Sequence, residues 1–169
     1  RADTARPDPW DYWVFNTRFN AFMNGERSSS NTNHNLFLSA NRTTDNLKVS
    51  INANTSTSRS RFDIDGGERI TSRRHQWNTG GRVVKSLGPR WSFGGMANVS
   101  HSSFNNINRS ISFSPAIEYN VFPYRESSKR SLTFHYTAGL VRYQYSEVTI
   151  FDPLDETLPR HGVAVALNL

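Results

Sequence analysis

The sequence contains no cysteine among its 169 residues and no long apolar run. The absence of cysteine excludes disulfide bonds, thiolate metal sites and cysteine catalysis. No segment approaches the ~20 apolar residues that a membrane-spanning helix needs. The mean hydropathy of −0.64 would suit a very polar soluble protein. In a transmembrane β-barrel, however, only alternate residues face lipid, so low hydropathy does not exclude that class.

Long runs of basic residues are also missing, although the formal net charge is +6. A basic balance invites a nucleic-acid partner. The longest basic runs are the pairs Arg73-Arg74 and Lys129-Arg130, and the remaining basic residues are scattered. We therefore expect no nucleic-acid partner. Aromatic residues make up 12% of the chain, which argues against a disordered protein.

The clearest pattern lies in residues 109–120, which read RSISFSPAIEYN. The odd positions from Ile111 to Tyr119 are apolar, and the even positions from Ser110 to Asn120 are mostly polar. Alternation with a period of two is typical of a β-strand with one apolar face. Pro115 lies in the middle of the apolar face and cannot donate to a ladder, so we expect a bulge, a missing hydrogen bond or an edge there.

The same alternation recurs along most of the chain, and no segment shows the apolar stripe of a helix. The sequence therefore predicts an all-β fold, an antiparallel up-and-down meander of about eight long strands that forms a transmembrane β-barrel or part of a larger barrel. Residues 1–9 contain two prolines and no periodicity and are predicted to be a leader or linker, with the barrel or barrel portion in 10–169. The predicted strands centre on 13–23, 33–41, 47–55, 77–83, 91–100, 109–120, 132–140 and 163–169.

The lengths of strands and connections favour the membrane barrel over a soluble sheet. Strands of about 10 to 14 residues exceed the soluble mean of about 5 to 6, and a tilted strand needs about 9 to 11 to cross the hydrocarbon layer. We expect short turns after the second and fourth strands, and longer loops at 25–30, 56–69, 103–108 and after the seventh strand, as in barrels with short periplasmic turns. Aromatic residues gather near the predicted strand ends, as in membrane-interface belts: Trp10, Trp13, Trp91, Tyr119, Tyr124, Tyr143 and Tyr145.

Three phrases carry a resemblance to a known group: WDYWVFNTRFNAFMNGE, VVKSLGPRWSFGG and SPAIEYNVFPYRESSKRSLTFHY. With them, the chain resembles the N-terminal part of an uncharacterised outer-membrane β-barrel family of Gram-negative bacteria. The resemblance implies a barrel longer than this chain, with a terminal aromatic residue on its last strand. Here the last predicted strand, 163–169, has no aromatic residue. We therefore expect a fragment of a larger barrel or a part that assembles with other chains.

Two histidines, His75 and His101, are weak candidates for a metal site. If Lys85 pairs with Trp91 across a short turn, the register places His75 directly opposite His101. Two imidazoles could hold a metal, but no third ligand is visible, so a polar pair above the lipid band is the favoured interpretation. No catalytic residue and no cofactor is predicted, since the abundance of serine makes Ser-His adjacency uninformative.

The predicted polar face defines the candidate lumen. Its charged residues are Arg18, Lys48, Arg82 and Glu118, which we expect to line a wet interior. A cationic lining would favour anions, whereas mutual salt bridges would simply fill the barrel. Four Asn-X-Ser/Thr sequons, at Asn41, Asn54, Asn98 and Asn108, would become candidate glycan sites only in an extracellular assembly.

Three functions are compatible with these features. The first is a bacterial outer-membrane β-barrel in the cell envelope, porin-like, with a structural or passive-channel role and the lipid bilayer as its partner. The second is a secreted or surface β-protein that self-associates into an extracellular assembly through unpaired strand edges. The third is an outer-membrane barrel enzyme, which we disfavour.

Overall fold

The computed structural model describes residues 9–64, 68–122, 131–150 and 154–168. It confirms the all-β antiparallel meander. The eight strands are β1 (Trp13–Gly25), β2 (Ser29–Thr43), β3 (Leu47–Asp63), β4 (Arg69–Ser86), β5 (Trp91–Ser102), β6 (Ile107–Asn120), β7 (Ser131–Tyr145) and β8 (Asp155–Asn168). Of the predicted leader, residues 1–9, only Pro9 is described. Among the described residues, no helix is long and apolar enough to cross a membrane.

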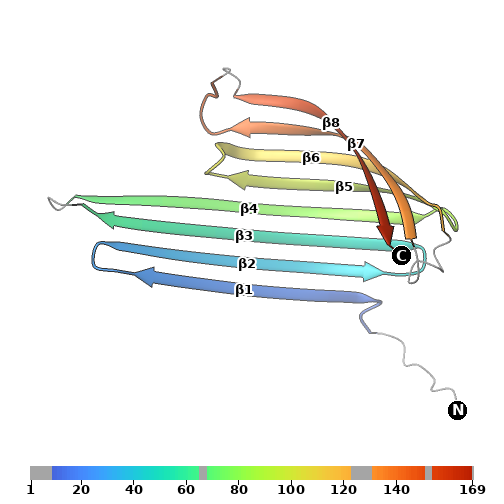
Figure 1. The fold of residues 1–169 in the computed structure, drawn as a ribbon, viewed down its shortest axis with the longest axis horizontal. Helices are drawn as coiled ribbons and strands as arrows, with labels where there is room; N and C mark the ends of the chain where they lie inside the picture. Colours follow the sequence, from blue (N-terminus) through green and yellow to red (C-terminus); the bar gives the residue numbers. More distant parts are fainter. Residues whose placement is uncertain (1–8, 65–67, 123–130, 151–153, 169) are drawn as a thin grey trace, which may run out of the picture.

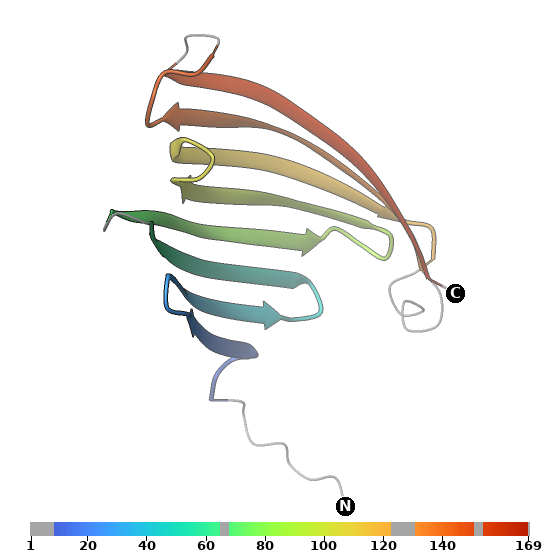
Figure 2. The same cartoon turned by 60° about the vertical axis from the view of Figure 1, so that its left-hand side comes forward.

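The strands form one sheet in the order β1-β2-β3-β4-β5-β6-β7-β8, and each is antiparallel to its neighbours. Figures 1 and 2 show a single curved layer, in which β7 and β8 bend most strongly. Within the described ranges β1 and β8 pair only with β2 and β7, so the sheet is open and has two edges. The hairpin of β3 and β4 extends beyond its neighbours at the end where β3 finishes (Figure 1).

The two faces of the sheet differ in chemistry as the alternation predicts. One cross-strand row runs Phe15, Ala40, Ile51, Gly81, Ala97, Phe113 and Leu140, and this side is called the apolar face. The adjacent row runs Asn16, Ser39, Asn52, Gly80, Asn98 and Ser112, and this side is called the polar face. Period-two alternation is sufficient to produce this separation, because successive side chains point to opposite faces.

The apolar face is not covered by any part of the described chain. Phe15 is 59% exposed, Met23 76% and Val163 72%, and Val141 is the only buried hydrophobic residue among those described. A soluble domain of this size would instead bury its large apolar side chains in a core. The sheet therefore has the distribution of apolar surface that a second hydrophobic layer, lipid or protein, would normally cover.

The exposed apolar side chains form a band across the sheet. Along β5 the apolar face reads Trp91, Phe93, Gly95, Ala97 and Val99, a length of about 27 Å at about 3.4 Å per residue. The aromatic prediction holds in part. Trp91 packs on Tyr119 with ring centroids 4.7 Å apart at one border of the band. Tyr143 and Tyr145, however, lie on the polar face, because Tyr143 pairs with Ser110.

The predicted difference between short and long connections is wrong for the first half of the chain. Residues 26–28 join β1 to β2, as few as in the turn 44–46, and the interval 64–68 between β3 and β4 is only one residue longer than the turn 87–90. The predicted loop 56–69 was misplaced because residues 56–63 continue β3, where they pair with both β2 and β4. Loop length therefore does not indicate which end of the sheet would face which side of a membrane. The strands, with 12 to 18 residues, are longer than predicted.

Pro115 interrupts one ladder, as expected from its missing N–H group. The register between β6 and β7 is the same on both sides of Ser114 and Pro115, yet these two residues have no partners on β7. On the other side Pro115 pairs with Gly95 of β5. The proline therefore marks a local loss of hydrogen bonding toward β7 and neither a bulge nor an edge.

Candidate functional site

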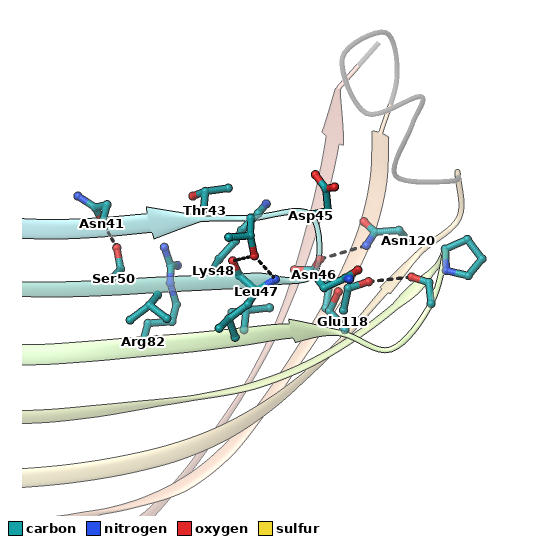
Figure 3. A pocket seen from close by; sticks show the side chains of 17 residues that line it. Asn41, Thr43, Asp45, Asn46, Leu47, Lys48, Ser50, Arg82, Glu118 and Asn120 are labelled. Atoms are coloured by element: carbon teal, nitrogen blue, oxygen red, sulfur yellow. Dashed lines mark hydrogen bonds between the residues drawn. The ribbon is translucent and has the colours of Figure 1, made fainter. Parts of the chain in front are cut away.

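A hollow lies on the polar face, at the end of the sheet where β2 turns into β3 and β4 into β5. It encloses about 740 Å³. Its walls come from β2 to β6, which bring together segments far apart in the sequence, and Figure 3 shows their side chains around the open space. The hollow exists because the sheet curves there, so that β6 rises beside the turn 44–46 (Figure 3).

Three of the four predicted lumen residues line this hollow: Lys48 from β3, Arg82 from β4 and Glu118 from β6. Arg18 has the same polar-face parity, opposite Phe37, but it lies on the edge strand β1 outside the hollow. Asp45, in the turn before β3, adds a second carboxylate to the rim. With two cations and two carboxylates the hollow has no net formal charge, and it can solvate a polar or zwitterionic solute better than a simple anion.

Amide side chains tie the polar face together. Asn78 donates through Nδ2 to Oδ1 of Asn98 at 2.7 Å, and Asn52 donates to Oδ1 of Asn78 at 3.5 Å. Near the hollow, Asn120 donates to Oε1 of Glu118 at 3.1 Å and accepts from the Thr133 hydroxyl at 2.6 Å. These bonds join β3 to β4, β4 to β5 and β6 to β7, which gives much of the polar face a hydrogen-bonded lining. Glu118 is therefore held by a neighbouring amide, and no ion pair involving it occurs among the described residues.

The predicted register between the strands of the two histidines is wrong. The true register is shifted by two residues, so each histidine stays on its predicted face. The turn 87–90 is closed by a hydrogen bond from the Leu87 N–H to the Trp91 carbonyl at 2.8 Å, so that Lys85 pairs with Phe93. This shift places Trp77 opposite His101. His75 becomes the diagonal neighbour of His101, and the two ring centroids lie 5.8 Å apart.

Each histidine already uses one ring nitrogen. His75 Nδ1 lies 3.0 Å from Oγ1 of Thr57, and His101 Nδ1 lies 2.8 Å from the carbonyl oxygen of Asn108. The described residues contain no group of three or more His, Asp or Glu side chains that could hold a metal ion. Structural zinc sites use four ligands and catalytic sites three, so the pair alone is an incomplete site.

Sequence reasoning missed a group of basic side chains at the far end of β3 and β4. Arg59 and Arg61 of β3 and Arg73 of β4 lie on the same side as the apolar face, in the rows beyond it. They are scattered in the sequence, and residues 56–69 were assigned to a loop, so their common face could not be seen. The signal that could have found them is their position in the sequence. Arg59 and Arg61 have odd numbers, like Ile51, Ala53 and Thr55, and so lie on the same face of the strand.

No protein-family model, no curated protein and no solved structure matches this chain. The resemblance to an outer-membrane barrel family therefore stays a prediction. The four sequons have different surroundings. Asn41 shares a short hydrogen bond with Ser50, Asn98 belongs to the amide network, and Asn54 and Asn108 are exposed.

Proposed function

We propose that this chain is an outer-membrane β-barrel protein, or the portion of a larger barrel, with a structural or passive-channel role. The observation that carries the proposal is the exposed apolar band, in a sheet whose only buried hydrophobic residue among those described is Val141. Lipid would cover that band without requiring a second protein layer. The polar face, with its amide network and charged hollow, would then face a wet interior.

The size of the sheet supports the same proposal. Strands of 12 to 18 residues exceed the about 9 to 11 that a tilted strand needs to cross the hydrocarbon layer. The band of about 27 Å along β5 becomes about 21 Å tall when the strand is tilted by about 40°, close to the apolar belt of known barrels. Closing the sheet requires partners for β1 and β8, either each other or further strands of the same barrel.

The open edges favour one alternative, a surface protein that self-associates into an extracellular assembly. Unpaired strands present a row of free N–H and C=O groups, and another chain can pair with them. In that case the apolar face would be covered by another copy of the sheet. No observation of this structure supports an enzyme in preference to either function, and the third hypothesis gains nothing.

A pair of arginine substitutions on β1 distinguishes lipid from water at the apolar face. Phe15 lies inside the band, in the row of Ala97, and the neighbouring residue Asn16 lies on the polar face and is exposed. In a bilayer, Phe15→Arg costs about 2–4 kcal/mol near the midplane, whereas Asn16→Arg adds a charge to the wet side at little cost. We expect Phe15→Arg to reduce the yield of protein inserted into phosphatidylcholine vesicles at least tenfold, and Asn16→Arg to leave it unchanged.

Fractionation provides the second half of the test. The wild-type protein should sediment with membranes and should need detergent to stay in solution. Solubility without detergent, together with an unchanged vesicle yield for Phe15→Arg, would refute the barrel. Concentration-dependent oligomers in detergent-free buffer that Phe15→Arg abolishes would favour the extracellular assembly.

A further inference from the structure

The three basic residues found beyond the apolar face form a compact cluster, here called the arginine patch: Arg59, Arg61 and Arg73. Arg59 and Arg73 are direct cross-strand partners, and Arg61 is two residues further along β3 on the same face. Like charges directly opposite each other destabilise a sheet. The repulsion between Arg59 and Arg73 therefore destabilises the sheet at this place, and a bound anion would reduce it.

Nothing within the described chain neutralises the patch. None of the three guanidinium groups forms a hydrogen bond or an ion pair with another described residue, and Arg61 Nε is buried without a partner. The nearest carboxylate in register, Asp63, is engaged by Arg69 at 2.6 Å. Glu26 and Glu68 lie exposed in the turns at this end and form no ion pair with the patch.

The other arginines of the apolar-face parity have partners, although Lys85 of β4, which is exposed, has none among the described residues, so the arginine patch is the exception among the arginines. Arg142 of β7 lies 3.1 Å from Asp155, and Arg42 of β2 lies 2.7 Å from Asp11. Arg109 of β6 donates to Oε1 of Gln144 at 3.0 Å. A cluster of unpaired guanidinium groups, in a sheet whose other arginines on this face are paired, points to an external anion.

The surroundings of the patch indicate which anion. Along β4 toward the patch, successive residues of this face are Trp77, His75 and Arg73. Along β3 they run from Ala53 through two threonines to Arg59. The half-buried apolar side chains of Trp77 and Ala53 are thus separated from the guanidinium groups by about 14 to 20 Å along a strand. A ligand that matches both has an anionic head and an apolar tail.

We propose that the arginine patch binds the phosphate group of a membrane lipid whose acyl chains lie against the apolar face of β2 to β4. Guanidinium groups suit this role because their fork of N–H donors binds phosphate oxygens in a bidentate manner. The proposal rests on the proposed function, because it places the apolar face in lipid. It adds that the end of the sheet bearing the patch meets a leaflet with phosphorylated headgroups.

The test uses the whole chain, delipidated and held in a neutral detergent micelle, so that its outcome does not depend on insertion into vesicles. Phosphatidic acid and phosphatidylcholine are titrated separately, and lipid retention is read by native mass spectrometry. The wild type should bind phosphatidic acid at least tenfold more tightly than phosphatidylcholine. The double variant Arg59→Gln/Arg73→Gln should lose about 25-fold in affinity for phosphatidic acid, because each basic residue near an anionic surface contributes roughly fivefold.

Arg74→Gln is the matched control. Arg74 is the next residue of the same strand, but it lies on the polar face, where its guanidinium carbon is 4.6 Å from the centre of the Phe104 ring. The control removes the same charge from the same strand and should leave the affinity unchanged. An equal loss in Arg74→Gln, or no loss in the double variant, would overturn the proposal.

Inorganic phosphate separates a lipid site from a site for a free anion. The proposal expects phosphate to compete only at concentrations far above those of phosphatidic acid, since it lacks the acyl chains. Equal potency of the two would overturn the assignment to a lipid. Equal retention of phosphatidic acid and phosphatidylcholine would do the same and would leave an acidic protein partner as the better occupant. Neither result bears on the vesicle and fractionation tests of the barrel itself.

Discussion

Gly94 on β5 is a position where a single added methyl group should disturb the sheet. A Cβ atom there would clash with the carbonyl oxygen of Val83 and would lie 3.1 Å from both Cα and Cγ2 of Val84. Two of these three atoms belong to the backbone of β4, so they cannot rotate away. Gly94→Ala therefore forces β4 and β5 apart at this point.

The magnitude follows from two opposing effects. Overpacking of a tight contact costs about 1–3 kcal/mol, while replacing glycine by alanine within a strand returns roughly 0.5–1 kcal/mol of backbone entropy. We expect Gly94→Ala to lower the free energy of unfolding by about 1–2 kcal/mol. Gly95→Ala, one residue on and on the opposite face, would place its methyl 3.7 Å from the nearest atom, an ordinary contact, and should be neutral or slightly stabilising.

Denaturant unfolding of both variants in the same detergent, followed by tryptophan fluorescence, measures the difference directly. The adjacent control removes the effects of strand position and of alanine propensity, which the two variants share. If Gly94→Ala were as stable as Gly95→Ala, the close approach of β4 and β5 at Val83 and Val84 would not exist in solution, and the reasoning would fail.

Three further outcomes are expected. Pro115→Val restores an N–H donor opposite Ala138 and should raise the free energy of unfolding by about 1 kcal/mol in the same assay. If the free energy did not rise, the gap in the β6–β7 ladder would have another cause. Arg82→Gln removes one of the two cations of the hollow and should shift the reversal potential of the reconstituted protein toward cations, while Arg18→Gln, outside the hollow, should shift it less. Zinc ions should affect the stability of the wild type and of His101→Ala equally, and a shift confined to the wild type would establish a metal site at His75 and His101.

The sequence predicts the faces of this sheet well because one physical rule, the period of two, determines them. Phe15, Ile51 and Phe113 fall in one cross-strand row, and each was assigned to the apolar face from parity alone. The same rule assigned Lys48, Arg82 and Glu118 to the polar face. Parity does not predict the curvature of the sheet, and only the curvature brings these three strands around one hollow.

The rule loses its signal where both faces become polar. Residues 56–63 read STSRSRFD, so hydrophobic alternation disappears although the backbone remains paired on both sides. In this stretch the two faces are Thr57, Arg59 and Arg61 against the serines 56, 58 and 60, a difference of charge instead of hydropathy. The strand and the arginine patch were missed together, because both required following charge at alternate positions.

Register was harder still, because it depends on the details of one turn. The histidine prediction assumed a turn centred on Gly88, whereas the hydrogen bond between Leu87 and Trp91 centres it on Pro89. A one-residue displacement of the centre moves every partner by two residues and therefore keeps each residue on its face. This is why His75 and His101 were correctly expected to be neighbours and incorrectly expected to be direct partners.

The two prolines within strands show that the edges of the sheet are not equivalent. Pro115 breaks the ladder toward β7, whereas the ladder between β7 and β8 runs without interruption through the pair Leu140 and Pro159. A proline whose nitrogen faced β7 would break that ladder as Pro115 does, so the nitrogen of Pro159 faces the free edge of β8. A strand added to β8 therefore meets one position without a donor, while β1 contains no proline and offers every N–H group of its free edge. Whether the partner is a further strand of the same barrel or a second chain, β1 is the edge on which every outward-facing backbone N–H group can donate a hydrogen bond to it.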